Sequence, residues 1–461
     1  MHIPPVFAER MRRLLGPEAE TFLTALAQPP YTGLRVNSLK LTPRRLRELV
    51  PWRLDPVPWC DDGFIVADDA RPGQHPYHAA GLYYLQEPSA MLPAQALAPR
   101  PGELVLDLSA APGGKATQMA ALMGDSGLLV ANEVEGSRRA ALAANLERWG
   151  ARSAVITGEW PQRLVERWGP VFDRVLVDAP CSGEGMFRKS EAALAQWSEK
   201  LVQGCAVRQR NLLDAAAALV RPGGYLAYST CAFAPEEDED VITRFLDSHS
   251  DFGLAPLHLP GAVAGRPEWA GAGLRAELAG AARIWPHLAP GEGHFVALLR
   301  KDAGAPMPLR HVAPAAAPRA AIRLWRDFAA CLGADPAAEM RLTLQGTRLY
   351  AVADGLPLNG LNVVRPGLWL GDVRGSRFEP SHSLALALRP AELHGASLPT
   401  LDMAPDDTRL ARYLQGHPLE VAGEVGWVLM TVSGYPIGWG RRAQGIIKNV
   451  YPKGLRRADS G

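Results

Sequence analysis

Two cysteines and one aspartate are the candidate catalytic residues of this sequence. Cys181 lies in DAPCSGEG (178–185), and Cys231 lies in YSTCAFAPEEDED (228–240). Each motif follows an apolar run typical of a buried strand, and open α/β sheets bind ligands at the carboxyl ends of their strands. Neighbouring strand ends would bring both thiols together beside Asp178. A thiol at such a cleft is a candidate nucleophile, whereas an isolated cysteine more often packs as a small hydrophobic residue.

A glycine turn marks a second candidate site, in LDLSAAPGGK (106–115). Gly113 and Gly114 let the backbone approach a ligand, and the helix that follows presents free N–H groups. The turn is not the dinucleotide-binding GxGxxG, and the chain contains no GxxxxGK[ST] phosphate loop. Glu133, at the end of the next strand, could accept both hydroxyls of a ribose, and Arg138 lies one turn into the following helix.

The turn, the strand-end acid and the later RPGG (221–224) together resemble class I methyltransferases, which use S-adenosylmethionine. The alternative is an α/β fold without a nucleotide, whose glycines only make turns. The acidic run EEDED (236–240) is interpreted as a charged helix N-terminus stabilised by the helix dipole.

Apolar runs alternate with amphipathic helices from Gly102 onward, which is typical of a parallel sheet covered on both faces. The predicted class is therefore doubly wound α/β. The expected strands are 103–109, 127–133, 153–157, 171–180 and 224–231. The expected helices are GGKATQMAALM, GSRRAALAANLERWG and AVRQRNLLDAAAALV.

Composition shifts divide the chain into four predicted parts. Residues 1–85 read as a small α+β domain, with helices at 6–15, 18–26 and 43–49 and strands at 31–39 and 63–66. The methyltransferase-like part is 86–302. An Ala- and Pro-rich linker opens 303–391, which continues as a small domain, and 392–461 is a second small β-rich domain.

Length and composition exclude several classes of protein. The chain has 461 residues, 47% of them hydrophobic and 21% charged, as in ordinary globular proteins of several domains. It has no apolar run of the roughly 20 residues that a membrane span requires, and its first residues lack a signal peptide's apolar region. The five cysteines form no CxxC pair, so neither a metal site nor a disulfide framework is predicted. We expect a cytoplasmic monomer.

Charge is distributed unevenly although the net charge is only +1. Residues 86–302 hold 21 basic and 26 acidic side chains, whereas 303–391 hold 10 and 6. This pattern favours an enzyme whose polyanionic substrate is held by flanking domains. The last segment concentrates candidate phosphate-binding cations, against the alternative of a frayed basic tail; they are Arg441, Arg442, Lys448, Lys453, Arg456 and Arg457.

AAPGGK, DAPCSGEG and STCAFAPEEDE resemble the RNA (cytosine-5)-methyltransferases of the NOL1/NOP2/Sun family. The similarity is strong over 86–301, and YTGLRVNSLK (31–40) is similar to the family's small preceding domain. GWGRRAQGIIKNVYPKGLRR resembles the PUA-like end of the bacterial branch that modifies small-subunit (16S) ribosomal RNA. The resemblance implies methylation of cytosine C5 in the decoding region of 16S rRNA, with free RNA and the assembled subunit both open as substrates.

The resemblance also implies roles for the catalytic residues. The attacking thiol belongs to the STC motif, which assigns it to Cys231 and a covalent bond to cytosine C6. Cys181 corresponds to the cysteine that eliminates the product, and Asp178 to the carboxyl group that holds the N3 and N4 edge of the base. Spacing alone leaves the nucleophile open, because DNA cytosine methyltransferases use the Pro-Cys thiol, here Cys181.

The cofactor-binding residues carry over in the same way. Glu133 would hold the ribose, with Arg138 nearby and Asp178 at the edge of the cofactor cleft. Glu159 is the nearest carboxylate to the expected adenine position, and Ser109 stands where many relatives have Cys. The methionine and sulfonium region falls to the turn residues Ser109, Ala110, Ala111, Pro112, Gly113, Gly114 and Lys115.

Two rival functions remain open. A methyltransferase acting on an exocyclic nitrogen usually has Asn or Asp followed by Pro-Pro-aromatic, whereas this chain has Asp-Ala-Pro-Cys, and that chemistry uses neither thiol. A non-catalytic ribosome-assembly factor with the same fold would not need the pair of cysteines or the intact glycine turn.

Overall fold

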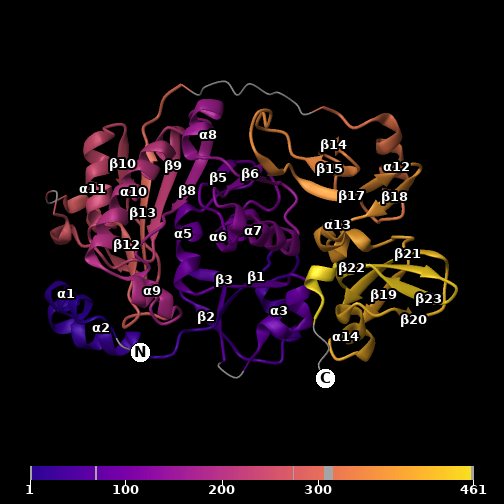
Figure 1. Cartoon of the computed structure of the whole chain (residues 1–461), viewed down its shortest axis with the longest axis horizontal. Helices are drawn as coiled ribbons and strands as arrows, with labels where there is room; N and C mark the ends of the chain where they lie inside the picture. The colour runs from indigo at the N-terminus through magenta and orange to yellow at the C-terminus, as the bar shows by residue number, and fades with distance from the viewer. Residues whose placement is uncertain (1–2, 68–69, 272, 274, 306–314, 458–461) are drawn as a thin grey trace.

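The computed structural model describes residues 3–67, 70–271, 273, 275–305 and 315–457. Figure 1 shows a central α/β body, a small sheet beneath it and two β-rich units on the right. Within the described ranges, no helix is long and apolar enough to cross a membrane. Residues 306–314 of the expected linker lie outside these ranges.

The central sheet carries the predicted parallel core. Strands β5, β6, β7, β8 and β9 run parallel, and β13 closes them antiparallel to β9. The order across the sheet is β11 (Val263–Ala264), β12 (Ala282–Ile284), β13 (His294–Lys301), β9 (Val220–Thr230), β8 (Phe172–Asp178), β5 (Leu104–Asp107), β6 (Leu128–Asn132), β7 (Ala154–Thr157) and β16 (Val363–Arg365). Strand β10 (Phe252–Ala255) pairs with β13. The doubly wound α/β class is confirmed.

Alternate side chains of each core strand enter different layers, because successive residues of a strand face opposite sides of the sheet. Leu106 packs among the helices α8, α10 and α11, whereas Val105 packs among α5, α6 and α7. These helices are α5 (Leu92–Leu97), α6 (Gly114–Leu122), α7 (Gly136–Trp149), α8 (Pro161–Trp168), α10 (Glu199–Ala217) and α11 (Glu239–Ser248). The short α9 (Glu191–Gln196) precedes α10.

Helix α10 and strand β9 both begin earlier than the sequence-based expectation. Helix α10 begins at Glu199 rather than Ala206, because the Ser198 side chain accepts a hydrogen bond from the Leu201 N–H at 3.2 Å and caps the helix. Strand β9 begins at Val220, so the RPGG segment lies within the strand.

The N-terminal segment divides between two places. Helices α1 (Pro5–Leu15) and α2 (Ala19–Leu26) pack on the central body, where Phe7 and Phe22 meet Phe187 and Phe233. The rest forms a small antiparallel sheet in the order β2 (Leu54–Val57), β3 (Cys60–Val66), β1 (Gly33–Val36) and β4 (Tyr83–Leu85), with α3 (Pro43–Leu49) and α4 (Pro76–Ala79).

The C-terminal segment forms two further sheets. The first contains β14 (Arg341–Gln345), β15 (Arg348–Val352), β17 (Leu368–Arg374) and β18 (Arg377–Pro380), with α12 (Arg319–Ala329) and α13 (His382–Ala387). The second contains β19 (Thr400–Met403), β21 (Gly426–Val432), β22 (Tyr435–Ala443), β23 (Ile446–Asn449) and β20 (Leu419–Glu420), with α14 (Thr408–Gln415). Strand β16 belongs to this C-terminal segment but pairs with β7. The C-terminal segment therefore adds an edge strand to the central sheet.

Candidate active site

The carboxyl ends of β5, β6, β8 and β9 bring the predicted residues to one edge of the sheet. The Sγ atoms of Cys181 and Cys231 lie 3.2 Å apart, although 50 residues separate them. The two loops are joined by the Gly185 N–H, which donates to the Cys231 carbonyl at 2.7 Å. Both thiols are half-buried. The predicted pairing of the cysteines is therefore present.

The surroundings of the two thiols differ. The pKa of Cys181 lies well above its ordinary value because Cys231 competes for the shared hydrogen bond, because burial disfavours a thiolate, and because Glu237 is close. The Lys115 ammonium interacts electrostatically with Cys231, and this attraction is among the causes that raise the pKa of Lys115. Burial and Glu237 therefore disfavour a thiolate at Cys181.

Asp178 is held on both carboxylate oxygens. Lys115 Nζ donates to Oδ2 at 2.7 Å, and the Ser229 hydroxyl donates to Oδ1 at 2.9 Å. His294 Nε2 lies 3.8 Å from Oδ1. Burial acts to raise the pKa of Asp178, but Lys115 and His294 outweigh it and the pKa is lowered. Asp178 is thus a carboxylate at neutral pH.

A cavity of about 200 Å³ opens beside this carboxylate. Its walls include Asp107, Ala111, Gly114, Lys115 and Asp178. Burial, together with the charge of Asp178, raises the pKa of Asp107 to about 7. Asp107 Oδ2 is buried without a hydrogen-bond partner among the described residues. The unpartnered oxygen of Asp107 and the carboxylate of Asp178 suit a ligand that carries positive charge.

The glycine turn is built around Glu133. Its Oε2 accepts the Ala111 N–H at 3.3 Å and lies 3.4 Å from Arg138 Nη1. Arg138 Nη2 donates to the Ala111 carbonyl at 2.5 Å. Gly113 caps α6 with a φ of 112°, in the left-handed region that favours glycine. Glu133 and Arg138 thus contact the turn itself. The turn residues that line the cavity are Ser109, Ala110, Ala111, Pro112, Gly114 and Lys115.

Glu159 follows β7, where its carboxylate accepts the Asn362 N–H at 2.5 Å. Asn362 belongs to the segment that leads into β16, and its carbonyl accepts from the Gly158 N–H at 2.9 Å. The buried Asn132 side chain donates to the Glu159 carbonyl at 3.0 Å. The predicted adenine corner is therefore closed in part by the C-terminal segment.

Sequence reasoning missed the role of the acidic run after Cys231. Helix α11 begins within this run as predicted, with Glu239 and Asp240 in its first turn, but Glu237 and Glu239 are fully buried. Glu237 Oε2 accepts the Ser182 N–H at 2.9 Å and the Gln209 amide at 2.8 Å, so it fixes the loop that carries Cys181. Glu239 pairs with the buried Arg283. Burial raises the pKa of Glu237 to about 7.

His294 was also missed. It opens β13 and is 4% exposed, and neither ring nitrogen has a hydrogen-bond partner among the described residues. Its place is fixed by the preceding segment, where Arg188 and Glu292 form a buried ion pair at 2.5 Å. A histidine after GEG in an otherwise apolar strand was the signal available in the sequence.

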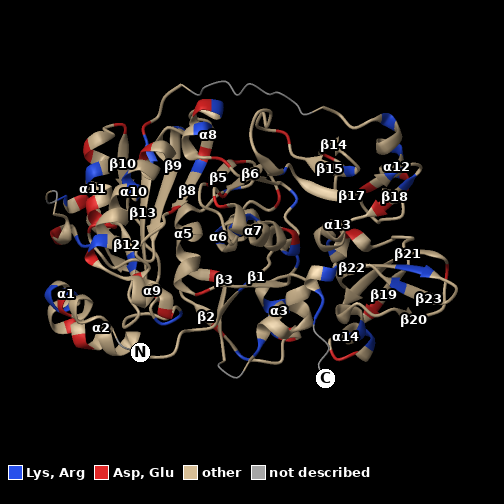
Figure 2. Cartoon of the chain, in the orientation of Figure 1, with Lys and Arg blue, Asp and Glu red and all other residues tan. Residues whose placement is uncertain are grey.

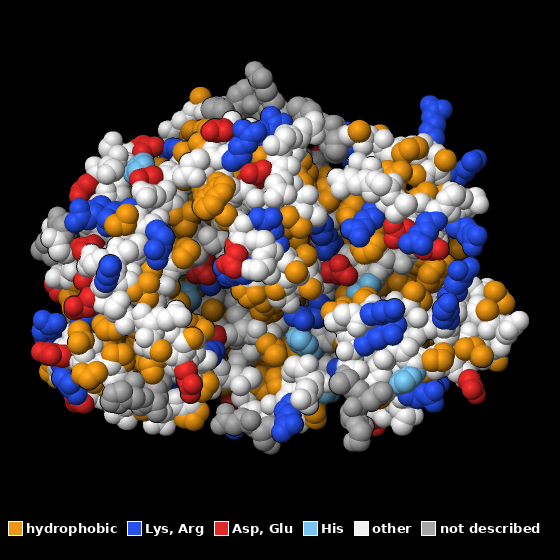
Figure 3. Space-filling model, viewed as in Figure 1, with side chains coloured by type: hydrophobic (Ala, Val, Ile, Leu, Met, Phe, Trp, Pro, Cys, Tyr) orange, Lys and Arg blue, Asp and Glu red, His pale blue; other side chains and the backbone are white. Residues whose placement is uncertain are grey.

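The predicted C-terminal cations occupy different surfaces. Arg441 pairs across the sheet with Lys448, both are exposed, and the Arg441 guanidinium lies 5.8 Å from the Trp427 ring centre. Arg442 points to the opposite face of β22 and is buried, so the expectation that it faces phosphates is corrected. Lys453 and Arg456 are exposed. Figure 2 marks Lys and Arg positions along the ribbon at this end of the molecule, and Figure 3 shows Lys and Arg side chains on the face it presents.

Across the described ranges, no group of three or more His, Cys, Asp and Glu side chains is arranged to hold a metal ion.

Four family models match the chain. They are 16S rRNA methyltransferase RsmB/F at residues 94–300, the N-terminal domain of 16S rRNA methyltransferase RsmF at 3–88, the first C-terminal domain of RsmF rRNA methyltransferase at 327–388, and the methyltransferase RsmF PUA domain at 400–457.

Similar proteins extend over nearly the whole chain. "Ribosomal RNA small subunit methyltransferase F" of Aeromonas hydrophila is 33% identical, over 95% of this chain and 94% of the relative. The protein of the same name from Erwinia tasmaniensis is 34% identical, over 98% and 97%. Among solved structures, a methyltransferase homolog from Pyrococcus horikoshii is 32% identical with a TM-score of 0.58, over 64% of this chain and 94% of that one.

Proposed function

The chain belongs to the RsmB/F family of 16S rRNA methyltransferases, and from this premise we propose that it methylates C5 of cytosine in 16S rRNA through a covalent bond to Cys231. It is an S-adenosylmethionine-dependent rRNA methyltransferase. The observation that carries the proposal is the pair of sulfur atoms 3.2 Å apart beside the Asp178–Lys115 ion pair.

S-adenosylmethionine supplies the methyl group as an electrophile when it is bound. The residues present fit this group, because the cavity next to Asp178 has a buried carboxylate oxygen on Asp107 that lacks a partner among the described residues. We assign the methionine and sulfonium end to the turn from Ser109 to Lys115 and the ribose to Glu133. Arg138 would act through its contact with the turn, and Glu159 would border the adenine.

Cytosine C5 is a poor nucleophile until a group adds at C6. The Cys231 thiolate would form an Sγ–C6 bond and push electron density to C5, which then takes the methyl group. Loss of the C5 proton and of the Sγ–C6 bond would restore the aromatic ring. Cys181 stays a thiol during the attack because its pKa is raised. In the elimination step it would donate its proton to the departing Cys231 sulfur, 3.2 Å away, and the thiolate so formed would take the C5 proton.

Asp178 would hold the edge of the base. Because its pKa is lowered, it is a carboxylate and can accept a hydrogen bond from the N4 amino group. The proton shared with N3 must then come from a cation, and Lys115 is the cation in contact with this carboxylate. That proton would offset the negative charge that develops when the thiolate adds at C6.

The substrate imposes further requirements. A base reaches a thiol in a cleft only when the RNA is locally single-stranded or the base is flipped out. We propose the decoding region as the target, the small subunit as its context, and a cytoplasmic monomer as the acting form. We also propose the divisions 1–85, 86–302, 303–391 and 392–461, with Arg441, Lys448, Lys453, Arg456 and Arg457 as RNA contacts.

Bisulfite sequencing of 16S rRNA tests the reaction. Cells that lack the gene should lose 5-methylcytosine at specific positions, and the wild-type gene should restore it. Restoration by Cys231→Ala would contradict the nucleophile assignment. A methyl group found on an exocyclic nitrogen instead would favour the rival methyltransferase, and no change in RNA would favour the assembly factor.

The two cysteines can be separated by their products. Cys231→Ala should bind S-adenosylmethionine normally but form no RNA–protein adduct, since no sulfur can bond to C6. Cys181→Ala should accumulate an adduct that persists on a denaturing gel, because attack proceeds while elimination is impaired. Normal turnover by Cys181→Ala, without an adduct, would remove its role in release.

A further inference from the structure

A second cavity, of about 480 Å³, lies where three parts of the chain meet. It is bordered by α4 of the N-terminal part, the last turns of α7, helix α13 and the end of the described chain. The residues that line it include His78, Arg148, His382, Tyr451 and Arg457. Its volume is in the range of sites that bind small molecules or single nucleotides.

Two guanidinium groups in this cavity lack a carboxylate partner among the described residues. Arg148 Nη2 donates to the Asn145 amide oxygen at 2.8 Å, and its carbon lies 5.9 Å from the Tyr84 ring centre. Arg457 donates a hydrogen bond from its backbone N–H to the Leu414 carbonyl, and this bond does not involve its guanidinium group. Glu147, the acid in the lining, faces Arg365 at 3.8 Å instead.

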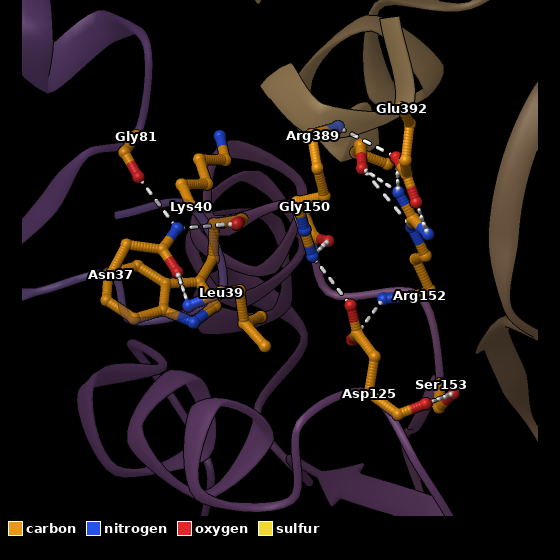
Figure 4. A network of polar contacts seen from close by, with 12 residues as sticks. Asn37, Leu39, Lys40, Gly81, Asp125, Gly150, Arg152, Ser153, Arg389 and Glu392 are labelled. Carbon is orange, nitrogen blue, oxygen red and sulfur yellow. Dashed lines mark hydrogen bonds and ion pairs between the residues drawn. The ribbon is translucent and has the colours of Figure 1, made fainter. Parts of the chain in front are cut away.

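The neighbouring carboxylates are already engaged. Figure 4 shows Arg152 directed at Glu392, with contacts of 2.7 and 2.5 Å, and Arg389 directed at Asp125, at 2.6 Å. The Lys40 Nζ donates to the Ala80 carbonyl at 2.7 Å, and burial together with Arg389 and Arg148 lowers the pKa of this amine. The junction therefore holds more positive than negative groups, and the surplus lies at the cavity.

The guanidinium groups of Arg148 and Arg457 both interact electrostatically with His78. Burial, together with the charges of Arg148 and Arg457, lowers the pKa of His78 to about 3. Charges of one sign that converge without a counter-charge are unfavourable unless an anion occupies the space between them.

We propose that this cavity binds a phosphate group of the RNA substrate, with Arg148 and Arg457 as its ligands. The assignment rests on the proposed function, since the RNA is the polyanion that this enzyme must hold. None of the described residues that line this cavity lines the one beside Asp178, although Arg148 contacts Asn145, whose side chain donates to the Pro112 carbonyl of the glycine turn at 2.8 Å. The contact would set the register of the RNA and not take part in the chemistry.

Binding of a 16S rRNA fragment to the full chain, measured against salt concentration, tests this site. Arg148→Gln and Arg457→Gln should each weaken binding about tenfold and reduce the salt slope by about 1, because one phosphate contact is lost. Arg457→Lys should keep the slope, since it keeps the charge. The matched control is Arg244→Gln, an exposed arginine on α11, at the opposite side of the molecule in Figure 1.

Kinetics and modification complete the test. The two Gln variants should raise KM for RNA while kcat and S-adenosylmethionine affinity stay unchanged. Phenylglyoxal modification of Arg148 and Arg457 should be blocked by the RNA and not by inorganic phosphate at equal phosphate concentration. Equal protection by inorganic phosphate would assign the site to a free anion, and unchanged RNA binding in both variants would remove it. Since binding is measured directly, a failure of the methylation proposal is distinguishable from a failure of this site.

Discussion

At the scale of single residues, the active site combines groups whose charges are set by their surroundings. Lys115 keeps Asp178 ionised, whereas burial and the charge of Asp178 keep Asp107 near its titration point at neutral pH. Two similar carboxyl groups thus carry different charges within one cleft, as a site that must bind both a sulfonium and a base requires.

The titration of Asp107 predicts a pH-dependent affinity for S-adenosylmethionine. With a pKa of about 7, the ionised fraction of Asp107 rises about tenfold from pH 6 to pH 8. A bound sulfonium favours the ionised form, so affinity should rise with pH over this range. Calorimetry on wild type and Asp107→Asn should show this rise in the wild type alone.

S-adenosylhomocysteine serves as the control ligand, because it lacks the sulfonium charge and should bind with a weaker dependence on Asp107. Parallel pH profiles for the wild type and Asp107→Asn would show that Asp107 does not face the sulfonium.

At the scale of elements, the site depends on how two loops meet after β8 and β9. The β8 loop continues into a short 3₁₀ helix at Glu184–Met186, and its Gly185 lies against the backbone of the β9 loop. An ideal Cβ on Gly185 would lie 2.8 Å from the Cys231 carbonyl oxygen and 3.0 Å from that of Gly293. Only glycine allows this approach.

Gly185→Ala should therefore displace the Cys231 backbone. We expect kcat to fall by about 10- to 100-fold, because small misplacements of a reacting group cost that much, while S-adenosylmethionine affinity changes little. Single-turnover methylation and calorimetry measure the two quantities.

The control is Gly204→Ala in α10, where the nearest atom to the added Cβ is 3.8 Å away, at the end of the Arg208 side chain. Alanine in that helix should leave kcat unchanged and favour folding slightly. Equal kcat in Gly185→Ala and wild type would show that the two loops tolerate separation.

At the scale of the whole molecule, the N-terminal and C-terminal parts share one core. Leu34 and Phe64 of the small N-terminal sheet pack with Leu410, Met430 and Tyr451 of the last sheet. Strand β16 and the junction in Figure 4 also connect the C-terminal segment to the central sheet and its helices.

Glu392→Gln tests the strength of this junction. The substitution removes the negative charge that accepts two hydrogen bonds from Arg152. Arg152 and Arg389 then have Asp125 as their remaining nearby carboxylate among the described residues. We expect a loss of about 1–3 kcal/mol in the free energy of unfolding, because the groups are only partly exposed. Denaturant titration measures the loss, with the exposed Glu424→Gln as control.

The pH dependence of this loss has a defined sign. Burial acts to raise the pKa of Glu392, but Arg152 outweighs it and the pKa is lowered from 4.5. The advantage of the wild type over Glu392→Gln should be present above about pH 4.5 and disappear as the pH falls through the lowered pKa. An unchanged difference at low pH would show that charge is not the cause.

The sequence by itself predicted the α/β class and the residues at the strand ends. Both follow from local signals, since apolar runs, a glycine turn and residues directly after a strand are read along the chain. Cys181, Cys231 and Asp178 therefore lie together as predicted.

The tertiary structure alone decided which groups surround them. His294 and Glu237 reach the site from strands and loops whose partners are distant in sequence. Burial gave the acidic run at the start of α11 a further role, as an internal support. Likewise, Arg148 and Arg457 meet because helix α7 and the end of the chain pack together. Such contacts depend on long-range packing, which periodicity and local propensity do not encode.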